Sequence, residues 1–454
     1  MPVPRGVIII RASSESELGP DPRERIHPFG LSVLFGVLYF IQSVSEPSDG
    51  LTGQPINSLL KSWGQNTAEI AAFTALLSLP WAIKPLYGLM SDFIPLAGYH
   101  RKSYLIAASS VAALCLVIAG AALVSEGSGG FFEGVLPMGP ASWLLLLLVP
   151  ATVGIAFTDV VVDALMVEKG QPHGLTGRFQ AVQWGALYGA TILTGSLGGY
   201  FSQHARQGLA FLICGGMAAG TLVLSASAVS ERRAGGAGRD VQAILRLLRH
   251  AAASRTILAV GIFLFCWNFN PFSMTVLYMY MTTELKFSEQ FYGNMMSLHA
   301  LAAMTGSLLY GLYCRRVPMP ILVHVSIVMG IASTIGYWAL EGERSALVIA
   351  AAAGFATATA TVIQLDLAAQ VCPPQAAGTL FALLMGLSNL GTALSMSLGG
   401  WCYQRWQDSW GHPLAFNLLV AIGALFTAGC WLVVPFLKAA LADRDAMPAA
   451  RPPG

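Results

Sequence analysis

The chain has 454 residues, of which 55% are hydrophobic and only 11% charged, and its mean hydropathy is +0.62. Ordinary soluble domains do not have this composition, so a soluble globular protein is excluded. The formal net charge of +2 gives no reason to expect a nucleic-acid partner.

Apolar stretches of membrane-spanning length recur along nearly the whole chain. A hydrocarbon core of about 30 Å requires roughly 20 helical residues. The sequence predicts an all-α membrane protein with twelve transmembrane helices, at about residues 29–45, 67–91, 103–124, 141–168, 178–202, 208–230, 256–283, 290–313, 319–340, 345–371, 376–403 and 414–438. We expect disordered tails at residues 1–28 and 439–454, because both are polar or rich in proline.

The basic residues indicate the orientation. With the N-terminus in the cytosol, 19 of the 25 Lys and Arg residues fall in cytosolic segments, five lie on the opposite side, and Lys84 lies within a span. The positive-inside rule favours this assignment. We expect a multi-pass protein of the plasma (inner) membrane, or of an organelle or plastid envelope, with both termini on the basic side.

The second predicted span contains Lys84 and leads into a polar hairpin. An ionisable residue in a span usually faces a protein interior or a watery cavity, so Lys84 is a functional-site candidate. The following Gly88, Asp92, Arg101 and Lys102 match the short cytosolic hairpin between the second and third helices of major-facilitator transporters. That resemblance implies that these four residues form a cytosolic gate.

Two carboxylates occupy the fourth predicted span. Asp159 and Asp163 are four residues apart and therefore share one helix face. Two carboxylates in a low-dielectric cavity cannot easily both be charged, which favours proton binding by one of them. The pattern indicates proton coupling or substrate binding; the alternative is a structural ion pair with Lys84 or with cytosolic cations.

An internal repeat divides the chain. Residues 176–203 align without gaps on residues 377–404, and both copies contain the run Ser-Leu-Gly-Gly. We expect two parallel six-helix halves, at residues 29–230 and 256–438, joined by a cytosolic linker at residues 231–255. Parallel halves of this kind place a substrate between them near the membrane midplane. For the glycines, the alternative is plain helix packing.

Further polar and aromatic residues are candidate substrate contacts in the fifth, seventh and tenth spans. Pro271 breaks the seventh span and frees backbone carbonyls there, and the 201-residue offset of the repeat maps Asp163 onto Gln364. The candidates are Gln180, Gln183, Trp184, Trp267, Asn268, Asn270, Gln364 and Asp366. For each of them, helix packing or a kink is the alternative.

Enzyme and channel functions are less favoured. The sequence has no nucleotide fingerprint, phosphate loop, serine-histidine pair or metal-ligand spacing, and its seven cysteines are scattered. We therefore expect no catalytic residue, no metal and no cofactor. A channel usually needs rings of like groups from several subunits, whereas this chain has a pseudo-twofold repeat of its own, which favours a monomer.

Several motifs resemble the folate-biopterin transporter family of the major facilitator superfamily. They include Trp81-Ala-Ile-Lys-Pro-Leu-Tyr-Gly88, Asp159-Val-Val-Val-Asp163, and Cys372-Pro-Pro374 followed by Leu380-Phe-Ala-Leu-Leu-Met385. The resemblance implies the major facilitator fold and secondary active transport of folates or pterins by alternating access, commonly by proton symport. Lys84 would then suit the glutamate tail of a folate. Another metabolite, such as S-adenosylmethionine, is the alternative substrate.

Overall fold

The computed structural model describes residues 28–125, 138–170, 175–229, 231, 233, 254–313, 316–372 and 377–437. These residues form helices and no strand, with one isolated bridge between Leu96 and Tyr99. The expected tails lie almost entirely outside the described residues, as does most of the expected linker.

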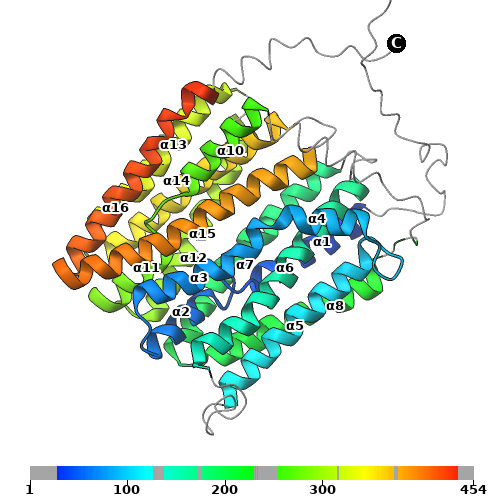
Figure 1. The fold of residues 1–454 in the computed structure, drawn as a ribbon, viewed down its shortest axis with the longest axis horizontal. Coiled ribbons are helices and arrows are strands. Elements are labelled where there is room, and N and C mark those ends of the chain that lie inside the picture. Colours follow the sequence, from blue (N-terminus) through cyan, green and yellow to red (C-terminus); the bar gives the residue numbers. More distant parts are fainter. Residues whose placement is uncertain are drawn as a thin grey trace, which may run out of the picture.

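The described residues of the first half form eight helical segments. In chain order they are α1 (Pro28–Ser45), α2 (Gly53–Ser62), α3 (Thr67–Ala82), α4 (Lys84–Phe93), α5 (Lys102–Ser125), α6 (Pro140–Gly170), α7 (Thr176–Gln203) and α8 (Gln207–Ala228). Within this half α5 packs along α8 and α6, and α1 packs along α7 and α8. Figure 1 shows α5 and α8 side by side at one edge of the molecule.

The second half is described from residue 254 onward. Its helices are α10 (Arg255–Asn268), α11 (Met274–Met279) with a π-helical turn (Tyr280–Glu284), α12 (Glu289–Tyr313), α13 (Met319–Ile335), α14 (Glu343–Val371), α15 (Ala377–Trp410) and α16 (His412–Gly429). Short 3-10 turns follow α13 (Gly336–Ala339) and α16 (Cys430–Leu432). In Figure 1 α13 and α16 lie at the edge opposite α5 and α8.

Nine helical stretches in the described part of the chain are long and apolar enough to cross a bilayer. The other three expected spans correspond to α7, α12 and the interrupted α10 and α11. In α7 and α12 polar side chains and glycines lower the hydropathy, while α10 has only 14 residues before the break. The all-helical membrane fold is confirmed, and twelve spans are consistent with it.

Two helix pairs make the most extensive contacts between the halves. α3 packs along α15, and α7 packs along α12; Figure 1 shows α3 beside α15 in the middle of the molecule. Because α7 and α15 begin at aligned positions of the repeat, each half contributes the same repeat helix to one of the two contacts. The packing agrees with a pseudo-twofold arrangement of the bundles.

The repeated Gly-Gly pairs lie at these contacts. A Cβ on Gly199 would lie 3.0 Å from the Glu289 carbonyl oxygen of α12, and a Cβ on Gly400 would lie 2.2 Å from the Ala71 Cβ of α3. The preceding glycine, Gly399, passes so close to the Pro271 carbonyl that a Cβ would clash at 1.8 Å. Small residues thus allow the close helix approach that packing in lipid requires.

Candidate functional site

Lys84 forms an ion pair with Asp159 inside the first half. Its Nζ lies 2.6 Å from Asp159 Oδ2, and the two side chains are 20% and 7% exposed. The Nζ also lies 4.4 Å from the ring centroid of Trp81, within cation–π range. Pro85 explains the position of the lysine, because it has no N–H for the helical ladder and the helix is interrupted at Ile83, directly before Lys84.

Asp163 lies one turn further along α6 and has different partners. Its Oδ1 accepts hydrogen bonds from the Tyr39 hydroxyl and, at 3.1 Å, from Gln183 Nε2. Asp159 Oδ1 accepts one from Gln42 Nε2 at 2.6 Å. Tyr39 and Gln42 are three residues apart on α1, so one face of α1 meets the one face of α6 that bears both carboxylates.

We call these six residues the N-half charge cluster: Tyr39, Gln42, Lys84, Asp159, Asp163 and Gln183. They come from α1, α4, α6 and α7, so four helices of one bundle converge on two carboxyl groups and one ammonium. A second negative charge beside the first is unfavourable in a low-dielectric interior. The cluster can therefore hold one proton in addition to the charge of Lys84.

A further carboxylate extends the polar contacts. Trp81 Nε1 donates to Glu46 Oε1 at 3.3 Å, and Ser48 Oγ donates to the same oxygen at 2.7 Å. Glu46 is only 6% exposed and lies in the turn between α1 and α2. The sequence analysis missed Tyr39, Gln42 and Glu46. They are spaced three and four residues apart around the end of α1, but α1 also carries Ser32, Ser43 and Ser45, so this spacing alone does not single them out.

The second half carries amides where the first half carries charges. Asn268 Nδ2 donates to the Leu264 carbonyl at 2.9 Å and lies 3.4 Å from Gln364 Oε1. Gln364 is buried, and its Nε2 has no hydrogen-bond partner among the described residues. We call Asn268 and Gln364 the C-half amide pair. A buried donor without a protein partner is costly unless a ligand or water satisfies it.

The remaining candidates of the seventh and tenth spans lie apart from this pair. Asn270 Nδ2 donates to Thr334 Oγ1 at 3.2 Å, and the Trp267 ring packs against Gly330 of α13. Asp366 accepts hydrogen bonds from the Tyr310 hydroxyl at 2.7 Å and from Gln370 at 3.1 Å. The helix break expected around Pro271 is present between α10 and α11.

Of the three candidates on α7, only Gln183 joins the N-half charge cluster. Gln180 and Trp184 are exposed. The Trp184 ring lies 5.9 Å from the Tyr188 ring, and the Tyr188 hydroxyl is 2.8 Å from Ser307 Oγ of α12. Trp184 is thus next to a contact between the halves, and its role as a substrate contact stays a prediction.

The expected gate residues form an ionic group within the first half. Arg101 pairs with Asp92 at 2.5 Å and with Glu168 at 2.7 Å, and Glu231 accepts from the backbone N–H of Arg101 and Lys102. Burial opposes the charge of Arg101, but the two carboxylates outweigh it and raise the pKa of the guanidinium. Gly88 lies opposite Val160 of α6. A bridge from this group to the second half stays a prediction.

Hydrogen bonds between the halves join the ends opposite this gate and the middle of the bundle. Gln54 Nε2 donates to the Glu289 carboxylate at 2.9 Å, Lys61 Nζ to Thr282 Oγ1 at 2.8 Å, and Asn389 Nδ2 to the Trp81 carbonyl at 3.1 Å. In addition, α4, which leads into the gate, packs on α15 of the second half.

Comparisons with known proteins agree with this architecture. The family model described as the BT1 family matches residues 51–338, and that of the Major Facilitator Superfamily matches residues 258–446. The chain is 28% identical over 388 residues to the folate-biopterin transporter of Synechocystis sp., covering 80% of this chain and 72% of the relative. It is 21% identical over 400 residues to folate transporter 1 of Plasmodium falciparum, covering 85% and 75%.

Solved transporters share the fold at low sequence identity. The nucleoside transporter NupG superposes with a TM-score of 0.64 at 13% identity, covering 90% of this chain and 99% of that chain. A D-xylose-proton symporter also gives 0.64 at 14% identity, covering 90% and 97%. The major facilitator fold and the family resemblance expected from the motifs are confirmed.

Proposed function

This chain belongs to the BT1 family and is a multi-pass membrane transporter, and we propose that it carries folates or pterins by alternating access, coupled to protons. The substrate proposal draws on the relatives named as folate or folate-biopterin transporters in a cyanobacterium and in Plasmodium falciparum. The coupling proposal rests on the chain's own residues.

The observation that carries the coupling proposal is the charge imbalance of the N-half charge cluster. One ammonium, Lys84, faces two carboxyl groups that lie four residues apart on α6. Asp159 is ion-paired, so the more favourable place for an extra proton is Asp163, whose partners Tyr39 and Gln183 are neutral. A proton taken up there on one side and released on the other would couple transport to the pH gradient.

The contacts between the halves support alternating access. Gln54 and Lys61 hydrogen-bond the halves to each other at the ends opposite the gate. In parallel two-half transporters the substrate site lies between the halves near the midplane. The proposed cycle opens this midplane site to one side of the membrane at a time.

Lys84 is the proposed contact for a substrate carboxylate. Its side chain keeps 20% of its surface exposed, whereas that of its partner Asp159 keeps 7%. A folate's glutamate tail could compete with Asp159 for the ammonium, and protonation of a carboxyl in the cluster would favour that exchange. The C-half amide pair, with the unpaired donor of Gln364, would then bind the heterocycle.

A cationic metabolite such as S-adenosylmethionine is the second candidate. The same excess of carboxylate over ammonium in the cluster favours it, because a positive substrate could take the place of the extra proton. This candidate predicts transport that needs no proton movement.

One uptake experiment separates the candidates. The purified full chain would be reconstituted in liposomes, and uptake of labelled folate, biopterin and S-adenosylmethionine would be measured side by side, with and without an imposed pH gradient. We expect saturable folate or pterin uptake that the gradient drives above equilibrium. S-Adenosylmethionine uptake alone, indifferent to the gradient, would support the second candidate, and unsaturable flux without counterflow would indicate a channel.

A further inference from the structure

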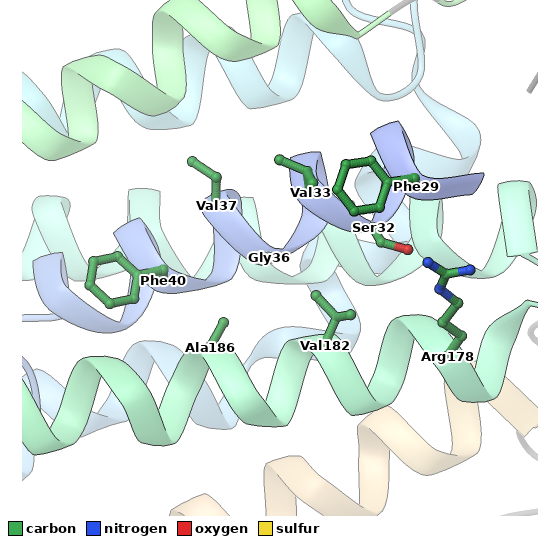
Figure 2. Close-up of a pocket in the computed structure, with 9 residues that line it drawn as sticks. All are labelled: Phe29, Ser32, Val33, Gly36, Val37, Phe40, Arg178, Val182 and Ala186. Atoms are coloured by element: carbon green, nitrogen blue, oxygen red, sulfur yellow. The ribbon is translucent and has the colours of Figure 1, made fainter. Parts of the chain in front are cut away.

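An apolar groove runs along the outside of the first bundle between α1 and α7, and none of its lining residues belongs to the N-half charge cluster. Its volume is about 580 Å³. Gly36 forms part of its floor, where a Cβ would lie 3.0 Å from Val182 Cγ1. Figure 2 shows the other apolar side chains along its two walls, namely Phe29, Val33, Val37 and Phe40 from α1 and Val182 and Ala186 from α7.

This groove faces the hydrocarbon of the membrane. On α1, Phe29, Val33 and Val37 are 63%, 48% and 41% exposed and recur every four residues. Tyr39 and Gln42 lie on a different face of the same helix, which is turned toward α6. Exposed apolar side chains on a spanning helix are solvated by acyl chains, so the groove is a place for a chain and not for a polar solute.

One end of the groove carries a cation. Arg178 lies in the first turn of α7, and Figure 2 shows its guanidinium beside Ser32 and near Phe29, at the start of the groove. The Arg178 side chain is exposed and makes no hydrogen bond or ion pair with any other residue of the described ranges. It belongs to the side of the protein that holds 19 of the 25 basic residues.

We propose that this groove binds one anionic phospholipid of the cytosolic leaflet, with an acyl chain between α1 and α7 and the headgroup phosphate on Arg178. From Phe29 to Phe40 the groove runs about 16 Å along α1, which matches the hydrocarbon depth of one leaflet. The cytosolic leaflet carries the negative headgroups that basic residues at helix ends attract. A guanidinium donates paired hydrogen bonds to phosphate oxygens, which gives it a geometric advantage over a lysine.

The lipid would contact two helices that supply residues to the N-half charge cluster. α1 supplies Tyr39 and Gln42, and α7 supplies Gln183 and packs on α12 of the other half. An occupied groove therefore stabilises the packing of α1 on α7. This inference does not depend on which substrate the protein carries.

The test uses the full chain, purified and delipidated in detergent, with phosphatidylglycerol and phosphatidylcholine of identical acyl chains. Native mass spectrometry counts bound lipids, and the melting temperature is measured in parallel. We expect one phosphatidylglycerol to bind about tenfold more tightly than phosphatidylcholine and to raise the melting temperature. Arg178→Gln should remove this preference, and Arg178→Lys should keep part of it.

Two further variants separate the groove from general charge attraction. Arg255→Gln removes an exposed arginine at the start of α10, outside the groove, and should leave the preference unchanged. Val33→Trp fills the groove from an exposed position and should weaken both lipids. Equal binding of the two lipids to the parent chain, an unchanged preference in Arg178→Gln, or an equal loss in Arg255→Gln would overturn the proposal.

Discussion

The two halves share a fold but differ in the polar groups at their centres. The repeat maps Asp163 of α6 onto Gln364 of α14. Asp163 belongs to a cluster with a lysine and a second carboxylate, whereas Gln364 lies against Asn268. Titratable charge is thus concentrated in the first half and neutral amides in the second. We propose that this difference reflects a division of labour: proton binding in one half, and hydrogen bonding to a neutral part of the substrate in the other.

Removal of Asp159 should have the largest effect on the protein itself. Asp159→Ala leaves the mostly buried Lys84 ammonium without its ion-pair partner, which costs about 3–5 kcal/mol in comparable buried pairs. We expect a clear fall in the melting temperature of the purified protein. The double variant Lys84→Met with Asp159→Leu should restore stability but not transport. A stable single variant would show that the pair is not a structural element of the first half.

Replacement of Lys84 tests whether the N-half charge cluster also binds substrate. In Lys84→Ala, the affinity for folates that carry a glutamate tail should fall about tenfold, equivalent to about 1.4 kcal/mol. Biopterin, which has no such tail, should lose much less. Competition uptake with both compounds measures the ratio. If both lose affinity equally, Lys84 is a structural partner of Asp159 and its proposed contact with the tail is wrong.

Replacement of Gln364 tests whether the amides of the second half bind substrate. Gln364→Ala removes the unpaired Nε2 donor, so substrate affinity should fall by about 1 kcal/mol, the usual value of one hydrogen bond. The response of uptake to an imposed pH gradient should stay as in the parent. Asp366→Asn is the matched control, because Asp366 pairs with Tyr310 on a different face of α14. A lost pH response in Gln364→Ala would contradict the division between the halves.

The ionic group of Arg101, Asp92 and Glu168 adds further charge at the basic end of the first half. If Asp92 helps to bridge the two halves in the outward-open state, Asp92→Asn should shift the population toward the inward-open state, with a differential within the usual coupling range of about 1–3 kcal/mol. Labelling of single cysteines in the central cavity measures the shift at equal expression. Identical accessibility in variant and parent would show that Asp92 has no role in gating.

The sequence predicted the architecture and the charged residues for the same reason. Lipid demands long apolar helices and makes ionisable residues within them rare, so the spans, Lys84, Asp159 and Asp163 stand out. Tyr39 and Gln42 do not stand out, because both residue types are ordinary. Their contacts with Asp163 and Asp159 join positions 124 and 117 residues apart, and only the packing of α1 on α6 reveals them.

The internal repeat shows which positions of the two halves are equivalent, but it does not show which residues are in contact. It maps Asp163 onto Gln364, and the nearby Asp366 is by its sequence position a candidate for the same site. Two residues along a helix differ by about 200° in direction, and the structure places Gln364 toward Asn268 of α10 and Asp366 toward Tyr310 of α12. A linear motif cannot distinguish these faces without knowledge of which helices pack on each.

The most direct test of the central claim is concentrative uptake by the Asp163→Asn variant in liposomes under an imposed pH gradient. The amide keeps the shape of the side chain and can still contact Tyr39 and Gln183, but it cannot take up a proton at this position. We predict that accumulation above equilibrium is abolished, while exchange of substrate across the membrane remains partly intact. If Asp163→Asn still concentrates substrate when the pH gradient is applied, proton coupling does not pass through the N-half charge cluster at Asp163.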